Sequence, residues 1–152
     1  MKTLAHQRCR AEIVRRLRSL RPESTRRWGQ MSAHQMICHL CDSCRIATGE
    51  RRASDAGGLM QRTLVKWIAL YLPVRWPPGL PTRPEVDQLV GGTKPVEFAA
   101  DVAQLEALLE FITTRDRGFD WAAHPIFGTM SQAAWLRWAY LHADHHLRQF
   151  GA

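Results

Sequence analysis

The chain has 152 residues, of which 45% are hydrophobic and 23% are charged, and these are ordinary values for a globular domain. This length is enough to bury a core without disulfides, and we expect one domain over residues 1–152. No stretch approaches the roughly 20 consecutive apolar residues of a membrane-spanning helix, and the N-terminal segment lacks the apolar centre of a secretory signal. The sequence therefore predicts a cytoplasmic protein without a membrane segment.

The net charge of +7 is confined to one end of the chain. Residues 1–27 contain nine Lys or Arg side chains and two Glu, whereas the charges of the remainder cancel. Such a basic strip is typical of a nucleic-acid-binding surface or of a solvated helix face. Because no aromatic or glycine-rich motif of a nucleic-acid reader lies among these charges, we favour the solvated face and keep nucleic-acid binding as an alternative.

Two helices are expected in the first third of the chain. Apolar side chains recur at helical spacing over residues 3–20, and Pro22 ends this segment because the residue before a proline avoids the helical region. A second helix is predicted over residues 32–48, since Ser32 and Gln35 have the spacing of a capping box.

The second predicted helix carries a histidine and three cysteines. A lone buried histidine such as His39 is more often a hydrogen-bonded core residue than a ligand, because an unpaired buried polar group is costly. His34 lies five residues earlier, about 140° round the helix, and is not expected to share an ion with His39. Cys38, Cys41 and Cys44 form a stripe that suits packing between helices better than a zinc site, which usually has a turn between paired cysteines.

The middle of the chain combines an apolar helix with a proline-rich segment. The helix is predicted over residues 59–72 and is apolar on more than one side, which indicates either burial or an oligomer surface. Residues 73–84 contain five of the eight prolines, so neither a helix nor a paired strand is expected there. We expect an extended crossover of roughly 20 residues, either a wall over a site or a passive strap, and we favour the strap.

Two further helices complete the chain. An amphipathic pattern predicts one over residues 98–114 and another over residues 131–150. The loop between them spans residues 115–130, and His124 precedes a proline and is expected to fix it. Since no segment shows a strand pattern, the chain is expected to be all-α.

The last predicted helix carries His142 and His146, which lie one turn apart on the same face. Together with His39, these imidazoles could close on one ion, because packed helices lie roughly 8–10 Å apart. Three neutral histidines leave a coordination position open, which is typical of a catalytic site. An open position on Zn²⁺ or a similar ion can hold a thiolate, or water with a pKa lowered to about 7. His145 offers a competing spacing, three residues from His142.

Further side chains are expected around this ion. Asp42 and His145 are candidates for acid–base catalysis or for orienting the ligands, whereas Asp144 projects away from the ligand face. Aromatic side chains are expected to wall a dry pocket. These are Trp28, Trp135 and Trp138.

Two segments near the ends of residues 28–150 resemble the DinB-like superfamily, in a branch of small bacterial proteins: WGQMSAHQMICHLCDS and HPIFGTMSQAAWLRWAYLHADHHLRQF. The resemblance implies a four-helix bundle, commonly a homodimer, with a three-histidine site for a divalent ion such as Zn²⁺ or Ni²⁺. The family's ligand positions fall on His39, His142 and His146. Relatives include bacillithiol-dependent S-transferases and a mycothiol-dependent maleylpyruvate isomerase, in which the metal holds and activates a low-molecular-weight thiol.

The sequence thus predicts an all-α protein, a DinB-like four-helix bundle with an additional helix in a long proline-rich crossover. Its predicted function is that of a metal-dependent thiol S-transferase or hydrolase acting on a small-molecule substrate. Two alternatives stay open. One is a non-enzymatic helical module that binds nucleic acid or an acidic partner through its basic first helix, and the other is a dimeric scaffold with a structural metal.

Overall fold

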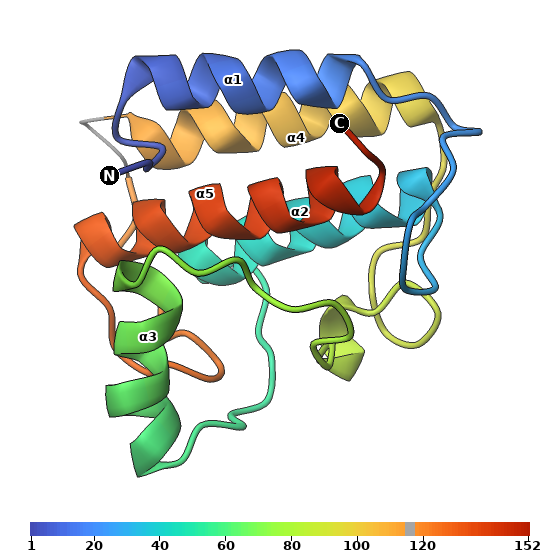
Figure 1. Ribbon diagram of the computed structural model, residues 1–152. Helices are drawn as coiled ribbons and strands as arrows, with labels where there is room; N and C mark the ends of the chain where they lie inside the picture. Colours follow the sequence, from blue (N-terminus) through green and yellow to red (C-terminus); the bar gives the residue numbers. More distant parts are fainter. Residues whose placement is uncertain (115–117) are drawn as a thin grey trace.

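The computed structural model describes residues 1–114 and 118–152 (Figure 1). In these two ranges the regular structure is helical, which confirms the prediction of an all-α chain. The predicted loop over residues 115–130 begins with three residues that lie outside the described ranges. The helices, in chain order, are α1 (Gln7–Arg18), α2 (Ala33–Thr48), a π-helical turn (Gln61–Val65), α3 (Lys66–Tyr71), a 3₁₀ turn (Pro84–Val86), α4 (Phe98–Thr113) and α5 (Gln132–Gln149).

The long helices pack together around one interior (Figure 1). Helix α2 packs most extensively against α4 and helix α1 against α5, and further contacts join α1 to α4 and α2 to α5. Leu17, Ile37, Leu105 and Leu147 come from these four helices and are fully buried in one core. Each such side chain stabilises the fold by about 1.5–3 kcal/mol when it leaves water. Within the described residues, none of the helices combines the length and hydrophobicity that crossing a bilayer requires.

Helix α1 is shorter than the predicted range 3–20. The backbone N–H of Leu4 donates to the carbonyl of Leu136 at 3.1 Å, and this bond holds the chain outside the helix. Leu4 and Leu20 are nevertheless buried. The apolar pattern therefore located the buried side chains correctly but overestimated the helix, because packing extends beyond the hydrogen-bonded turns.

Helix α2 begins where the sequence predicts. The Ser32 hydroxyl accepts from the backbone N–H of Gln35 at 3.1 Å, and Oε1 of Gln35 accepts from the backbone N–H of Ser32 at 2.8 Å. This reciprocal pair confirms the capping box. Gly49 ends the helix at φ 80°, a left-handed conformation that glycine adopts without steric strain.

The predicted helix over residues 59–72 forms, but it is irregular and largely exposed. Leu70 is the buried residue of α3, and its carbonyl accepts from Nε of Arg137 on α5 at 2.9 Å. Leu59 and Trp67 are 81% and 53% exposed, so burial of the whole segment, one of the two readings of its pattern, is wrong. The predicted homodimer stays a prediction, for which this apolar face offers a surface and which sedimentation equilibrium would test.

Candidate metal centre

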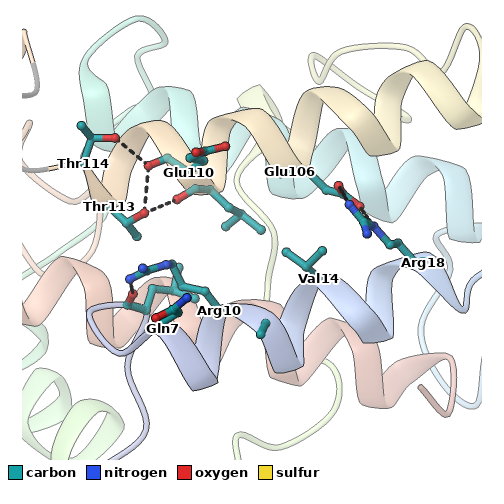
Figure 2. A pocket seen from close by; sticks show the side chains of 11 residues that line it. Gln7, Arg10, Val14, Arg18, Glu106, Glu110, Thr113 and Thr114 are labelled. Atoms are coloured by element: carbon teal, nitrogen blue, oxygen red, sulfur yellow. Dashed lines mark hydrogen bonds and ion pairs between the residues drawn. The ribbon is translucent and has the colours of Figure 1, made fainter.

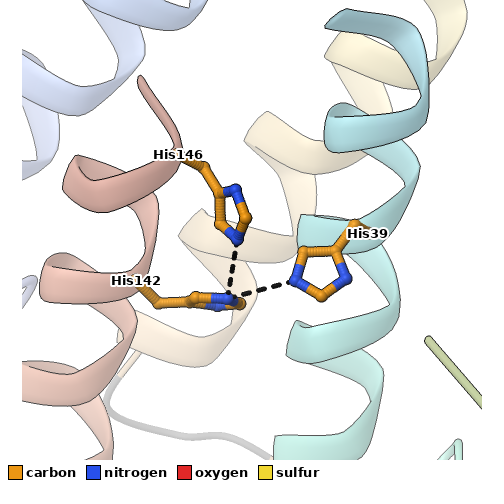
Figure 3. A group of neighbouring side chains, drawn as sticks. All are labelled: His39, His142 and His146. Atoms are coloured by element: carbon orange, nitrogen blue, oxygen red, sulfur yellow. Dashed lines mark hydrogen bonds between the residues drawn. The ribbon is translucent and has the colours of Figure 1, made fainter. Parts of the chain in front are cut away.

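Three histidines from α2 and α5 point towards one another (Figure 3). Nε2 of His142 lies 3.1 Å from Nε2 of His39 and 3.1 Å from Nε2 of His146. His39 and His146 are buried, and His142 is half-buried. The structure thus brings the three predicted histidines together, although His39 on α2 and His142 on α5 lie 103 positions apart in the chain.

The outer ring nitrogens of two of these histidines show where the protons lie. Nδ1 of His39 is 2.7 Å from the carbonyl oxygen of Val86, which can only accept, so this nitrogen carries the proton. Nδ1 of His146 is 3.0 Å from Oε1 of Gln149, whose Nε2 donates to the carbonyl of Trp28 at 2.8 Å. The second bond orients the amide with its oxygen towards the ring, so Nδ1 of His146 also donates.

The three Nε2 atoms that face one another therefore carry too few protons for both of their close contacts to be hydrogen bonds. In the neutral rings of His39 and His146, Nε2 carries a lone pair and no proton, and both lone pairs face Nε2 of His142. That atom can donate at most one proton, so one of the two contacts is without hydrogen. Burial lowers the pKa of all three imidazoles, for His142 and His146 well below the usual range, which disfavours a further proton.

A divalent cation suits this arrangement. Nitrogen ligands on a tetrahedral ion with bonds of about 2.0–2.1 Å lie about 3.3 Å from one another, close to the observed spacing. The fixed tautomers present Nε2 as the ligand atom, and the carbonyl of Val86 and the amide of Gln149 hold the rings in the way that supporting groups of metal sites do. The residues present therefore fit a metal ion, and the ligand roles stay a prediction.

The family of the chain is shown by a match over nearly its whole length. A sequence model of a family described as "Protein of unknown function (DUF1569)" matches residues 3–152. The chain belongs to the DUF1569 family. The matched range includes the three converging histidines. Comparisons with curated proteins and with solved structures found no match.

Aromatic rings surround the histidines of this DUF1569 chain. Trp138 packs on His142 with ring centres 4.5 Å apart and planes inclined by 32°. Trp28 contacts His145 instead of the cluster, with ring centres 5.9 Å apart. A cavity of about 10 Å³ borders His142, which is room for roughly one water molecule. The lining of this cavity is mostly apolar, which strengthens electrostatic interactions with any bound ion.

Trp135 does not take the place predicted for it. Its ring lies 5.2 Å from that of His124 and 5.4 Å from that of Trp138, and its Nε1 donates to the carbonyl of Ala122 at 3.1 Å. It thus supports the loop before α5 and lies behind Trp138. The sequence placed it in the pocket wall because helical spacing alone does not show which indole packs against a ligand.

The proline-rich crossover forms part of the site. Besides Val86, it contributes Trp76, whose ring centre lies 6.2 Å from that of His142 and 6.1 Å from that of His145. Nε1 of Trp76 donates to the carbonyl of Ala69 at 2.9 Å, which holds the indole in place. The favoured reading of a passive strap is therefore wrong, because this segment supplies both a hydrogen-bond acceptor and a wall.

Asp42 anchors this crossover. Its fully buried carboxylate accepts from the backbone N–H of Thr93 at 2.8 Å and from the Thr93 hydroxyl at 2.7 Å. Three side chains donate at 3.1–3.2 Å: Arg45, Arg51 and Gln88. None of these donors is a candidate ligand, so the geometry does not support the predicted acid–base role. Asp42 instead ties the crossover to α2, which keeps Val86 within reach of His39.

His145 lies beside the converging histidines and is not one of them. Its ring is buried between Trp28 and Trp76 and lies 5.2 Å from that of His146. Its Nδ1 has no hydrogen-bond partner in the part of the chain that the structure describes, and burial lowers its pKa. A free nitrogen next to the candidate centre is consistent with the predicted acid–base role, which stays a prediction.

A second cluster, which the sequence analysis missed, lies on another face of α2. Nε2 of His34 is 2.6 Å from Oδ2 of Asp101 on α4, and Sγ of Cys38 is 3.7 Å from the same oxygen. The spacing of four between His34 and Cys38 indicates a shared face. The carboxylate comes from a distant segment, which sequence spacing does not reveal.

A larger groove lies away from both clusters, between α1 and α4 (Figure 2). Its volume is about 460 Å³. Arg18 crosses from α1 to α4, where its guanidinium donates to both carboxylate oxygens of Glu106 at 2.7 and 2.8 Å. None of the candidate ligands lines this groove, so it is not the substrate pocket of the metal centre.

Proposed function

We propose that this DUF1569 protein binds a divalent ion, Zn²⁺ or Ni²⁺, through His39, His142 and His146. We further propose that the site serves a metal-dependent thiol S-transferase or hydrolase, carried by a four-helix bundle of the DinB-like type. One observation carries the metal site: two lone pairs in fixed tautomers face a third imidazole nitrogen in a buried cluster. The resemblance described above motivates the reaction class.

The residues around the candidate centre have separate proposed roles. His39, His142 and His146 would hold the ion, which would supply a Lewis acid with an open position and would lower the pKa of water or of a low-molecular-weight thiol co-substrate. Val86 and Gln149 orient the imidazoles, while Trp76 and Trp138 exclude water from them. His145, with its free Nδ1, exchanges a proton with the substrate.

The nucleic-acid alternative has less support. Several basic side chains of residues 1–27 are engaged within the chain: Arg16 donates to Asp144 at 2.7 Å, and Lys2 donates to Glu12 at 2.9 Å. Asp144 thus points away from the candidate ligands, as predicted. Binding through neutralised phosphates would weaken steeply with salt, and titrations of DNA and RNA at low and high salt would show it.

Metal analysis tests the three-histidine site. In protein purified without a histidine tag and loaded with Zn²⁺, His39→Ala is expected to lose one bound ion per chain, because two imidazoles alone hold an ion weakly. His6→Ala is the matched control, since His6 is exposed and lies at the start of α1. Equal zinc contents in wild type and His39→Ala would refute the site.

The reaction class is tested separately. Metal-loaded protein is screened with bacillithiol, mycothiol or glutathione against electrophiles, and thiol consumption is measured. Turnover that His39→Ala abolishes and His6→Ala retains would support the proposal. If the metal is structural, wild type is instead expected to show no turnover, and chelation of the metal is expected to lower the melting temperature.

A further inference from the structure

Helix α2 presents a second set of metal-ligand side chains towards α4. His34 and Cys38 lie one helical turn apart, and Asp101 lies in the first turn of α4. One donor atom from each residue lies within 4.8 Å of the other two. The donors are an imidazole nitrogen, a sulfur and a carboxylate oxygen, which together suit borderline transition metals better than Mg²⁺ or Ca²⁺.

We propose that His34, Cys38 and Asp101 form a second divalent-ion site, which binds Zn²⁺ or Co²⁺ and joins the start of α2 to the start of α4. Three protein donors leave a fourth position for water. The side chains of His34 and Asp101 are 19% and 16% exposed, so an ion can enter from solvent.

The distances allow an ion with little movement. Sulfur and oxygen ligands with bonds of about 2.3 and 2.0 Å lie about 3.5 Å apart on a tetrahedral ion, and Sγ of Cys38 is 3.7 Å from Oδ2 of Asp101. The hydrogen bond between His34 and Asp101 is 2.6 Å long, so these two atoms would separate to about 3.3 Å. The ion would replace this bond and the thiol proton.

Neighbouring groups already orient two of the three donors. The backbone N–H of Val96 donates to Oδ2 of Asp101 at 3.2 Å, and the ring of Phe98 packs edge-on against His34 with centres 5.3 Å apart. These contacts fix the carboxylate and the imidazole before an ion arrives, which lowers the ordering cost of binding.

The two sites are separate. Cys38 and His39 are consecutive residues and therefore point about 100° apart around α2. His39 faces α5 and Val86, whereas Cys38 faces Asp101 on α4. The second site differs from the first in containing sulfur, so its occupation can be observed independently of the three-histidine centre.

Cobalt spectroscopy tests the proposal. On titration of tag-free, reduced wild type with Co²⁺, we expect a near-ultraviolet thiolate-to-cobalt charge-transfer band, which three histidines cannot produce. Cys38→Ser should abolish the band. Cys41→Ser should keep it, because Cys41 lies one turn further along α2 and donates to the Asp101 carbonyl, outside the proposed ligand set.

Two more variants complete the test. His34→Gln, at a partly exposed position, should weaken the Co²⁺ affinity reported by the band at least about tenfold. His142→Ala should leave the band in place, whether or not the three-histidine centre binds metal. Absence of the band in wild type, or its persistence in Cys38→Ser, would overturn the second site and leave the first unaffected.

Discussion

Gln149 illustrates how side chains that are not ligands determine the geometry of the candidate centre. It is buried, and its amide links the ring of His146 to the backbone of Trp28. Gly29 leaves room for this amide, because a Cβ there would lie 2.5 Å from Nε2 of Gln149 and φ is +75°. The glycine of the WGQ segment thus bears on the orientation of a candidate ligand on α5.

Replacement of Gln149 tests this link. Gln149→Leu removes the acceptor of the Nδ1 proton of His146, so we expect metal affinity to fall about 10- to 100-fold, as measured by competition with a chromogenic chelator. Gln132→Leu is the control, because it makes the same change at an exposed position of α5. Equal affinities of the two variants would contradict the orienting role.

His124 is expected to make the stability of the protein depend on pH. Its Nδ1 accepts from the backbone N–H groups of Ile126 and Phe127, both at 3.1 Å, so it fixes the loop as predicted. Burial lowers its pKa from the usual 6.5 to about 4. The unfolded chain therefore binds the proton first as the pH falls, and we expect the free energy of unfolding to decrease between about pH 6.5 and 4, by up to about 3 kcal/mol.

The variant His124→Asn separates this contribution from that of the other histidines. Asparagine can accept from the same N–H groups but does not titrate. We expect a less stable variant at neutral pH whose free energy of unfolding falls less steeply than that of wild type as the pH drops to about 4.5. Urea unfolding with chelator present measures both curves, and parallel curves would rule out His124 as the source.

At the scale of elements, the crossover and α2 act together. Thr93 donates twice to the buried Asp42, and this contact holds an irregular segment against a helix. The same segment brings Val86 to His39 and Trp76 to His142. A largely irregular segment therefore has a defined position because its polar groups have buried partners.

Removal of one hydroxyl tests this anchor. Thr93→Val deletes a donor to Asp42 while keeping the shape of the side chain, and we expect the free energy of unfolding to fall by about 1–3 kcal/mol. Thr63→Val is the control, because Thr63 is exposed and its hydroxyl bonds within its own helical segment. Denaturant unfolding of both variants measures the fall in the free energy of unfolding. A fall in Thr93→Val no larger than in Thr63→Val would contradict the anchoring role.

At the scale of the whole molecule, the candidate centre joins segments that are far apart in the chain. An ion held by α2 and α5 would bind the folded state and not the unfolded chain. It would therefore increase the free energy of unfolding by about 2.7 kcal/mol at a free concentration of 100 times Kd. We expect Zn²⁺ to raise Tm by about 5–10 °C relative to chelated protein. Calorimetry measures the shift, and a shift of equal size in His39→Ala would show that it arises elsewhere.

The sequence by itself determined the helices and the candidate ligands. Apolar spacing located the long helices, Ser32 and Gln35 located the start of α2, and the spacing of His142 and His146 indicated one face of α5. These features are local, because they depend on residues within a few turns of one another.

Only the tertiary structure decided what surrounds those ligands. The carbonyl of Val86, the indole of Trp76 and the carboxylate of Asp101 come from segments without a sequence pattern that reveals their partners. Asp42 likewise proved to be an anchor and not a group facing the histidines. Such contacts depend on how distant segments pack, and local periodicity carries no information on that packing.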